Sequence, residues 1–322
     1  MIDLHTHSTF SDGSDTPSEL ARKAKDLGLH AIALTDHDTT ASYDEMRTAC
    51  DALSLELVSG VEVSLREGEF PRRDDHSRPR NVHLLGYFLP LEPEHPFQRT
   101  LASLRRDREV RNRALVDLLQ DKGFEYLTLD YLVALAGSPD SIGRPHFARA
   151  MFELHPEIVG ERTDESWNRV FADWLGSEGA AYIPKTGMPL EDFVAAGRGS
   201  GAVFSIAHPL VNYLDDHSSI ESTMPRVMAS LRERGVWGIE AYYGSTDTAT
   251  RALMVKLTRD AGMIPTGGSD YHGSYKRAID LGRGLNGDLR VPDEVLDELK
   301  AARSSNGHYP QRRSPLTQSE SA

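Results

Sequence analysis

Two histidines separated by a single residue, His5 and His7, come directly after a short apolar run at the start of the sequence. Side chains on a β-strand alternate between its faces, so both imidazole rings would project from the same face and could bind one metal ion together. A polar segment that contains a glycine, residues 11–16, follows the pair. A lone His-x-His pair is more often a surface or structural feature, so its meaning depends on the rest of the chain.

Further histidines and acids stand at the ends of the other apolar runs or within them. The carboxyl ends of parallel strands in α/β proteins meet at one site, so we expect these side chains to converge although they are far apart in sequence. Zn, Mn and Fe all accept such a mixture of imidazole and carboxylate ligands. The repetition of the pattern in successive units predicts a metal centre. The residues concerned are His5, His7, Asp36, His37, Asp38, Glu62, His83, His208, Asp270 and His272.

The scaffold that must position these residues is indicated by alternating strand and helix patterns. The alternation runs through residues 1–94, where residues 55–65 are interpreted as a pair of strands, and resumes over 198–303. It predicts an α/β fold with parallel strands and helices outside them. Residues 95–197 show mostly helical periodicity and are predicted to form an inserted helical domain or lid. The polar segment 304–322 is predicted to be a disordered tail.

Composition limits the partners that this chain can have. It has 322 residues and a net charge of −13, which disfavours binding to long nucleic acids. No apolar run reaches the roughly 18 residues of a membrane helix, and no secretory signal is recognisable at the start. Together with a single cysteine, Cys50, these features predict a cytoplasmic protein. The composition does not indicate an oligomeric state.

The segments HTHSTFSDG, LTDHD, GVEVS, VHLLGY, AHP and GSDYH resemble, in this order, the motifs of the PHP (polymerase and histidinol phosphatase) family. The resemblance implies a distorted (β/α)7 barrel and a centre of three divalent ions, Zn, Mn or Fe. Some family members carry histidine where Asp12 stands, and Ser11 and Asp15 are alternatives for that ligand. Carried over by motif, the ligands are His5, His7, Glu62 and Asp270 for the first ion, Glu62, His83 and His208 for the second, and Asp12, His37 and His272 for the third. Asp36 and Asp38, which flank His37, are candidates for supporting roles.

The predicted insertion carries positive charge that an acidic protein needs if it binds phosphates. Arg108 and Arg111 fall within the leucine stripe of a predicted helix, with Asn112 at its edge. They either pair with acids of the insertion or bind a substrate phosphate. The segment from Gly143 to His146, GRPH, opens another helix, where backbone N–H groups favour anions. It resembles a segment in the insertion of related PHP phosphoesterases.

Candidates for substrate binding are therefore Arg108, Asn112, Arg144, His146 and, from the YIPKTG segment, Lys185. The predicted function is hydrolysis of a small phosphorylated metabolite, a nucleoside bisphosphate or a cyclic phosphodiester, by water that the metal ions activate. No covalent nucleophile is expected. A histidinol phosphatase and a PHP module without catalytic activity are the alternatives. A nucleic-acid exonuclease is disfavoured by the net charge.

Overall fold

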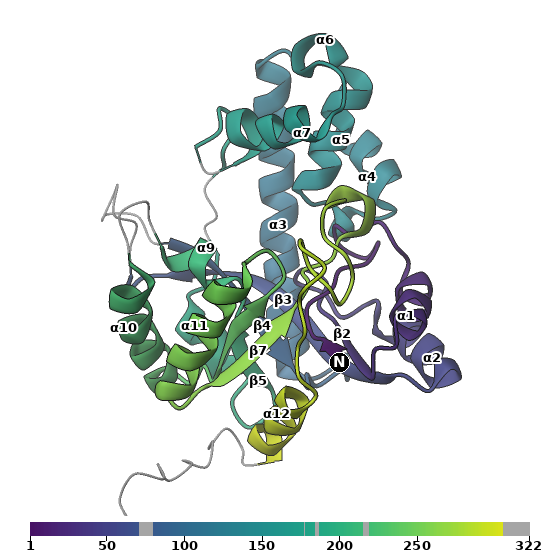
Figure 1. Cartoon of the computed structure of the whole chain (residues 1–322). Coiled ribbons are helices and arrows are strands. Elements are labelled where there is room, and N and C mark those ends of the chain that lie inside the picture. The colour runs from purple at the N-terminus through teal and green to yellow at the C-terminus, as the bar shows by residue number, and fades with distance from the viewer. Residues whose placement is uncertain (71–79, 177, 184–186, 215–218, 305–322) are drawn as a thin grey trace, which may run out of the picture.

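The computed structural model describes residues 1–70, 80–176, 178–183, 187–214 and 219–304. Seven strands form one sheet in the order β1 to β7, and a hydrogen bond from Leu4 N to Gly267 O, 3.2 Å, draws the first and last strands together. The sheet is therefore a nearly closed barrel (Figure 1). The strands are β1 (Ile2–Asp3), β2 (Ala31–Leu34), β3 (Glu56–Glu67), β4 (Arg80–Tyr87), β5 (Val203–Ile206), β6 (Gly238–Tyr243) and β7 (Ile264–Gly268).

The strand β4 runs against its two neighbours, β3 and β5, whereas all other neighbouring pairs are parallel. The expectation of parallel strands throughout was therefore wrong for β4. Twelve residues, 68–79, separate β3 from β4, which is about the minimum length of a helical crossover between parallel strands. The predicted pair of strands in residues 55–65 is also wrong, because Glu56–Glu67 is one strand. Its Gly60 is an interior position where a Cβ atom would lie 2.8 Å from the Thr35 side chain.

Helices outside the barrel connect the parallel strands. The first of them begins with a capping box: the Thr16 side chain accepts from the Glu19 amide, and the Glu19 carboxylate accepts from the Thr16 amide. The helices around the barrel are α1 (Pro17–Asp26), α2 (Tyr43–Leu53), α9 (Pro209–Tyr213), α10 (Ile220–Glu233), α11 (Thr248–Asp260) and α12 (Glu294–Ser304). Ser304 ends α12, so only residues 305–322 of the predicted tail lie outside the described residues.

A group of helices lies between β4 and β5 in sequence. Most of them gather at one end of the barrel (Figure 1), but the last packs into the barrel core through Leu190, Phe193 and Val194. The first half of α3 packs into the barrel core through Phe97, Leu101 and Leu104, and its second half packs into a separate core within the insertion. The helices are α3 (Pro96–Asp121), α4 (Leu129–Ala136), α5 (Arg144–Leu154), α6 (Pro156–Val159), α7 (Asp164–Val170) and α8 (Leu190–Ala196), with the π-helix Phe171–Leu175 after α7. The boundaries at 95 and 197 stay a prediction. No helix among the described residues is both long and apolar enough to cross a membrane.

Candidate active site

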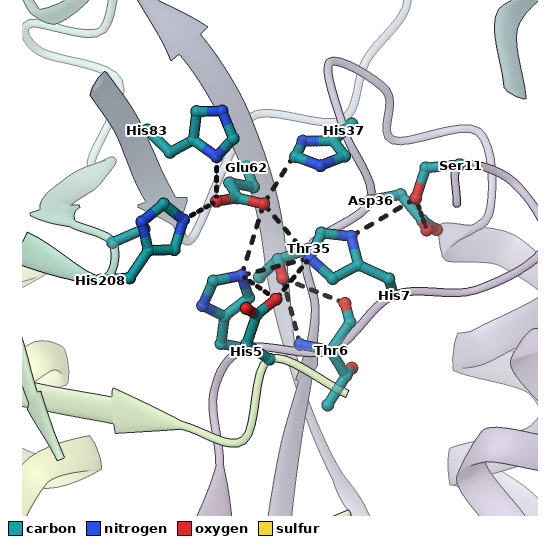
Figure 2. Close-up of polar contacts among 12 residues, drawn as sticks. His5, Thr6, His7, Ser11, Thr35, Asp36, His37, Glu62, His83 and His208 are labelled. Atoms are coloured by element: carbon teal, nitrogen blue, oxygen red, sulfur yellow. Dashed lines mark hydrogen bonds and ion pairs between the residues drawn. The ribbon is translucent and has the colours of Figure 1, made fainter. Parts of the chain in front are cut away.

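The carboxylate of Glu62 lies between two groups of histidines (Figure 2). Its Oε1 atom is 2.8 Å from His83 Nδ1 and 3.0 Å from His208 Nε2. Its Oε2 atom is 3.4 Å from His5 Nε2 and 3.2 Å from His7 Nε2. Glu62 is buried in the middle of β3, and a carboxylate that presents one oxygen to each group has the geometry of a bridge between two cations.

The other four predicted ligands lie beside this arrangement. Asp270 Oδ1 is 3.5 Å from His5 Nε2. The Asp12 carboxylate faces His272 Nε2 at 3.3 Å through Oδ1 and His37 Nε2 at 3.6 Å through Oδ2. All nine residues predicted as ligands are thus brought to one place. Three subsets have donor atoms close enough to hold an ion: His7, Asp12, His37 and His272; His5, His7 and Asp270; and His37, Glu62 and His83.

The donor atoms at this site fit metal ions better than they fit one another. His5 Nε2 and His7 Nε2 are 3.1 Å apart, and both also face Asp270 Oδ1. Among the described residues, Asp12 Oδ1, His37 Nδ1 and His208 Nδ1 are buried without a hydrogen-bond partner. Buried polar atoms normally have partners, so a cluster of unsatisfied donors and acceptors indicates a group that binds there.

At His37 and Glu62 the electrostatics favour a neutral imidazole beside an ionised carboxylate, which are the protonation states that metal binding requires. Burial lowers the pKa of His37 well below its usual value, although Asp12 and Glu62 oppose the change. Burial alone would raise the pKa of Glu62, but the neighbouring histidines, His37 first, hold it well below its usual value. Burial would lower the pKa of His5, but the carboxylates of Glu240 and Glu62 raise it well above its usual value. The carboxylates therefore attract positive charge to this place.

Three residues at the site have a left-handed backbone that non-glycine residues rarely adopt. Asp38, His208 and Asp270 have φ angles of 58°, 29° and 59°. Each of them lies within four residues of the end of a strand: β2, β5 and β7 in turn. Such conformations are costly and gather at functional sites, where the surrounding structure imposes them. Here they turn the chain so that the His208 and Asp270 side chains face the other ligands, and the Asp38 carboxylate meets Arg108 of α3.

Two buried acids, which the sequence analysis did not identify as site residues, hold the ligands through the second ring nitrogen of His5 and through backbone amides. Glu240 on β6 accepts from His5 Nδ1 at 2.8 Å and from the His208 amide at 2.6 Å. Asp3 accepts from the His5 and Ser269 amides at 3.2 and 2.9 Å. A carboxylate on the second nitrogen of a histidine fixes the orientation of the ring and makes it a better ligand. Glu240 stands within the run GIEAYY, and its strand position was the available sequence signal.

Asp36 supports the N-terminal motif rather than the centre itself. Its carboxylate accepts from the Ser8 amide at 2.8 Å. It also accepts from the Ser11 hydroxyl at 2.6 Å (Figure 2). The Ser11 hydroxyl lies 3.4 Å from His7 Nδ1. Asp36 therefore holds the loop between His7 and Asp12 in shape. Ser11 is occupied in this way, and Asp15 pairs with Lys23, so Asp12 is the residue of this loop that faces the centre.

Lys276 and Tyr243 are further residues that sequence reasoning missed. Both contact Asp270 Oδ2, Lys276 Nζ at 2.7 Å and the Tyr243 hydroxyl at 3.0 Å. They leave Oδ1 of Asp270 to face the histidines. Lys276 follows the GSDYH motif by four positions, a separation that gave no signal because a lysine in a loop is usually a surface residue.

The two arginines within the leucine stripe of α3 have different surroundings. Arg108 donates through Nε to Asp38 Oδ2 at 3.0 Å, so its partner is an acid of the barrel and not of the insertion. This pair ties α3 to the loop after β2, and it explains why a charge lies in the leucine stripe. Arg111 has no hydrogen bond or ion pair with any described residue, and burial lowers its pKa to about 10.

The GRPH segment reaches the centre through its glycine and arginine. A Cβ atom at Gly143 would lie 2.9 Å from Asp12 Cβ, so only glycine allows this close approach. Arg144 lines the same cavity as most of the predicted ligands and has no hydrogen bond or ion pair with a described residue. His146 Nδ1 accepts from the Gly143 amide at 3.1 Å, and Asn112 donates to Ile142 O at 3.1 Å.

His146 and Asn112 thus hold the segment in place and are not among the residues that line the cavity. Lys185 lies outside the described residues. The cavity has a volume of about 340 Å³, which lies at the lower end of the usual range for small-molecule sites. Its floor carries the histidines and acids, and Arg144 and Lys276 supply cationic groups to its wall.

Comparison with known proteins places this arrangement in a family. The family model "PHP domain" matches residues 3–167, just over half of the chain. The chain is 28% identical to a phosphoribosyl 1,2-cyclic phosphate 1,2-diphosphodiesterase of Eggerthella lenta over 90% of this chain and 98% of the relative. It is also 28% identical to a 3′,5′-nucleoside bisphosphate phosphatase of Chromobacterium violaceum, over 87% and 90%, and 26% identical to a 5′-3′ exoribonuclease of Haemophilus influenzae, over 84% and 89%.

Two solved structures are similar along nearly the whole chain. One, from Bifidobacterium adolescentis, is described as a metal-dependent phosphoesterase, and it matches with a TM-score of 0.74 and 28% identity over 93% of this chain and 95% of the other. An amidohydrolase structure from Chromobacterium violaceum has the same TM-score and identity over 93% and 96%. The chain belongs to the PHP domain family. Within it, this protein is an enzyme, a metal-dependent phosphoesterase.

Proposed function

We propose that the nine converging residues bind three divalent ions and that the enzyme uses them to hydrolyse a nucleoside bisphosphate or a cyclic phosphodiester. The position of Glu62 is the observation that carries the proposal, since its two oxygens face separate groups of histidines. The unpartnered atoms of Asp12, His37 and His208 support it. The resemblance of the sequence motifs supplies the number of ions.

When bound, divalent ions at such a site neutralise phosphate charge and lower the pKa of water, so that it can attack phosphorus near neutral pH. The protein's own residues complete the environment. Arg144 is placed to bind phosphate oxygens in the cavity, where its guanidinium has no other partner among the described residues. Lys276 adds a second positive charge beside Asp270. No serine or cysteine nucleophile is part of the proposal.

The substrate class follows from where positive charge lies. A substrate with two phosphate groups, or with a diester, can contact the floor of the cavity and Arg144 at once, whereas a small monoester reaches one of them. The names of two relatives, a cyclic phosphate diphosphodiesterase and a 3′,5′-nucleoside bisphosphate phosphatase, agree with this expectation.

The test is phosphate release by purified protein of measured metal content. The panel comprises a nucleoside 3′,5′-bisphosphate, a cyclic phosphodiester, a nucleoside monophosphate, histidinol phosphate and p-nitrophenyl phosphate. The proposal expects the highest kcat/KM for one of the first two substrates. Preference for histidinol phosphate would overturn the proposed substrate class, and absence of activity on all five would overturn the proposed reaction.

A second candidate, 5′-3′ exoribonuclease activity, is favoured by one observation. Three relatives with 26–27% identity over 84% or more of this chain bear that name. The net charge of −13 disfavours a long RNA footprint, but an enzyme that holds one terminal nucleotide needs only the cavity. Release of mononucleotides from a 5′-phosphorylated oligoribonucleotide, compared with bisphosphate hydrolysis at equal enzyme concentration, decides between the two candidates.

A further inference from the structure

Aromatic side chains line the cavity above the predicted metal ligands, and neither the proposed ions nor the phosphate contacts use them. Three aromatic residues belong to the cavity lining: Trp167 on α7, Phe171 at the start of the π-helix, and Tyr275 at the end of the 3₁₀ helix Gly273–Tyr275 that follows β7. These three residues are called the aromatic wall below. They come from the insertion and from the barrel, which meet at this end of the molecule (Figure 1).

The rings of the aromatic wall pack against one another and against neighbouring side chains. The Trp167 and Tyr275 rings are nearly parallel, with an interplanar angle of 9° and centroids 6.3 Å apart. Phe171 packs against Trp167 with centroids 5.7 Å apart. The Arg162 guanidinium lies over the Trp167 ring, 4.6 Å from its centroid. Rings held on several sides lose little freedom when a ligand packs against them.

The GRPH segment supports the same wall. The His146 ring meets the Tyr275 ring edge-on with centroids 5.5 Å apart. A side-chain hydrogen bond joins Arg149 and Tyr275. His146 thus connects two functions of α5: its Nδ1 atom holds the turn before Arg144, and its ring holds Tyr275.

The chemistry next to the wall indicates what it contacts. Asn168 follows Trp167 and lines the same cavity, so that an amide able to donate and accept hydrogen bonds lies beside the rings. Val211, whose exposed fraction of 70% is unusual for a large apolar side chain, lines the cavity as well. A ligand that matches the cavity has a phosphate at the metal-ligand floor, and a flat ring with hydrogen-bonding edges at the wall.

We infer that the aromatic wall is a nucleobase site and that the natural substrate of this enzyme is a nucleotide rather than a sugar phosphate without a base. The inference rests on the proposed function, because it assumes that the phosphate lies at the floor. Aromatic side chains bind bases by stacking regardless of sequence, and asparagine recognises the hydrogen-bonding edge of adenine. Trp167, Phe171 and Asn168 are then residues that determine specificity.

The test compares a ligand that carries a base with the same phosphate without it. Equilibrium binding of AMP and of ribose 5-phosphate to the metal-loaded enzyme is measured, and chromatography checks that both ligands remain intact. We expect AMP to bind about 10-fold more tightly or better, the scale of one stacking contact. Trp167→Leu should remove most of this preference and leave the affinity for ribose 5-phosphate unchanged. Tyr126→Leu is the matched control, because Tyr126 is an exposed aromatic residue of the insertion outside the cavity lining.

Equal affinity of the wild-type enzyme for the two ligands would overturn the inference without any variant. An equal loss of affinity for AMP and for ribose 5-phosphate in Trp167→Leu would also overturn it. A third ligand, a 5′-phosphorylated diadenosine dinucleotide, distinguishes a free nucleotide from an RNA 5′ end as the source of the base. If AMP is preferred but no phosphate ester is hydrolysed, the nucleobase site stands and the proposed function fails. If esters are hydrolysed without preference for a base, the proposed function stands and the nucleobase site fails.

Discussion

Each oxygen of the Glu62 carboxylate faces a different group of histidines. A side-chain amide has only one oxygen, so it cannot replace both carboxylate oxygens. Glu62→Gln keeps the side-chain volume, removes the negative charge and puts an N–H donor where a second acceptor stands. We expect loss of metal and a fall in kcat of about 100-fold or more, the scale of losing a key electrostatic group. Glu56→Gln is the control, since Glu56 is on the same strand but pairs with Lys300 at the surface. Full activity and metal content in Glu62→Gln would mean that Glu62 is not a ligand.

Glu240 acts through the ring of His5 rather than at the reacting atoms. Its Oε1 atom lies 2.8 Å from His5 Nδ1, and both side chains are buried. Glu240→Gln should reduce metal affinity by about 10- to 100-fold, the usual effect of losing a partner of a metal-binding histidine. Metal titration followed by activity measures it: saturating metal should restore most of kcat. A kcat that stays low at saturating metal would contradict a role limited to positioning.

Arg144 has no partner among the described residues and lines the cavity, so its charge is available to the substrate. Arg144→Ala should cost about 1.5–3 kcal/mol in kcat/KM on a nucleoside bisphosphate, the worth of a charge-assisted hydrogen bond. Hydrolysis of p-nitrophenyl phosphate should change much less, and the metal content should stay the same. Arg113→Ala, which removes a surface arginine of α3 paired with Glu109, is the control. An equal loss on both substrates would place Arg144 at the reacting phosphate instead.

Among the elements, the turn that opens α5 connects the insertion to the metal-ligand floor through one glycine. Gly143→Ala would put a methyl group 2.9 Å from Asp12 Cβ, so Asp12 or the turn must move. We expect lower activity with the barrel intact, measured by kcat and by circular dichroism. Gly68→Ala is the control, because nothing lies within 4 Å of a Cβ atom there. Unchanged kcat in Gly143→Ala would show that the contact with Asp12 has no bearing on the reaction.

The elements also show how far sequence reasoning reaches. Histidines and acids at the ends of apolar runs predicted the convergence correctly, because a strand end fixes where its next side chain lies. The reversal of β4 was not predictable from periodicity, since a strand has the same alternation in either direction. Arg108 was recognised as a charge in an apolar stripe, but its partner, Asp38, is 70 residues away. Glu240, Lys276 and Trp167 were missed because their roles arise only when separate segments meet.

At the scale of the whole molecule, the barrel gathers the candidate ligands and the insertion covers them. The insertion has its own apolar core, yet α3 extends from that core into the barrel core. A long helix shared by both cores fixes the position of Arg108 and the rest of the insertion relative to the floor. This arrangement places Arg144 of the insertion at the wall of the cavity in a chain whose net charge is negative.

The metal content of the enzyme tests the central claim most directly. Protein made in metal-replete medium is analysed for Zn, Mn and Fe, and the same sample is assayed for phosphate release from a nucleoside bisphosphate. The nine converging residues predict a content that approaches three ions per chain, with activity rising as the ions are restored after chelation. A reproducible content near one ion per chain with full activity would contradict a centre of three ions at these residues.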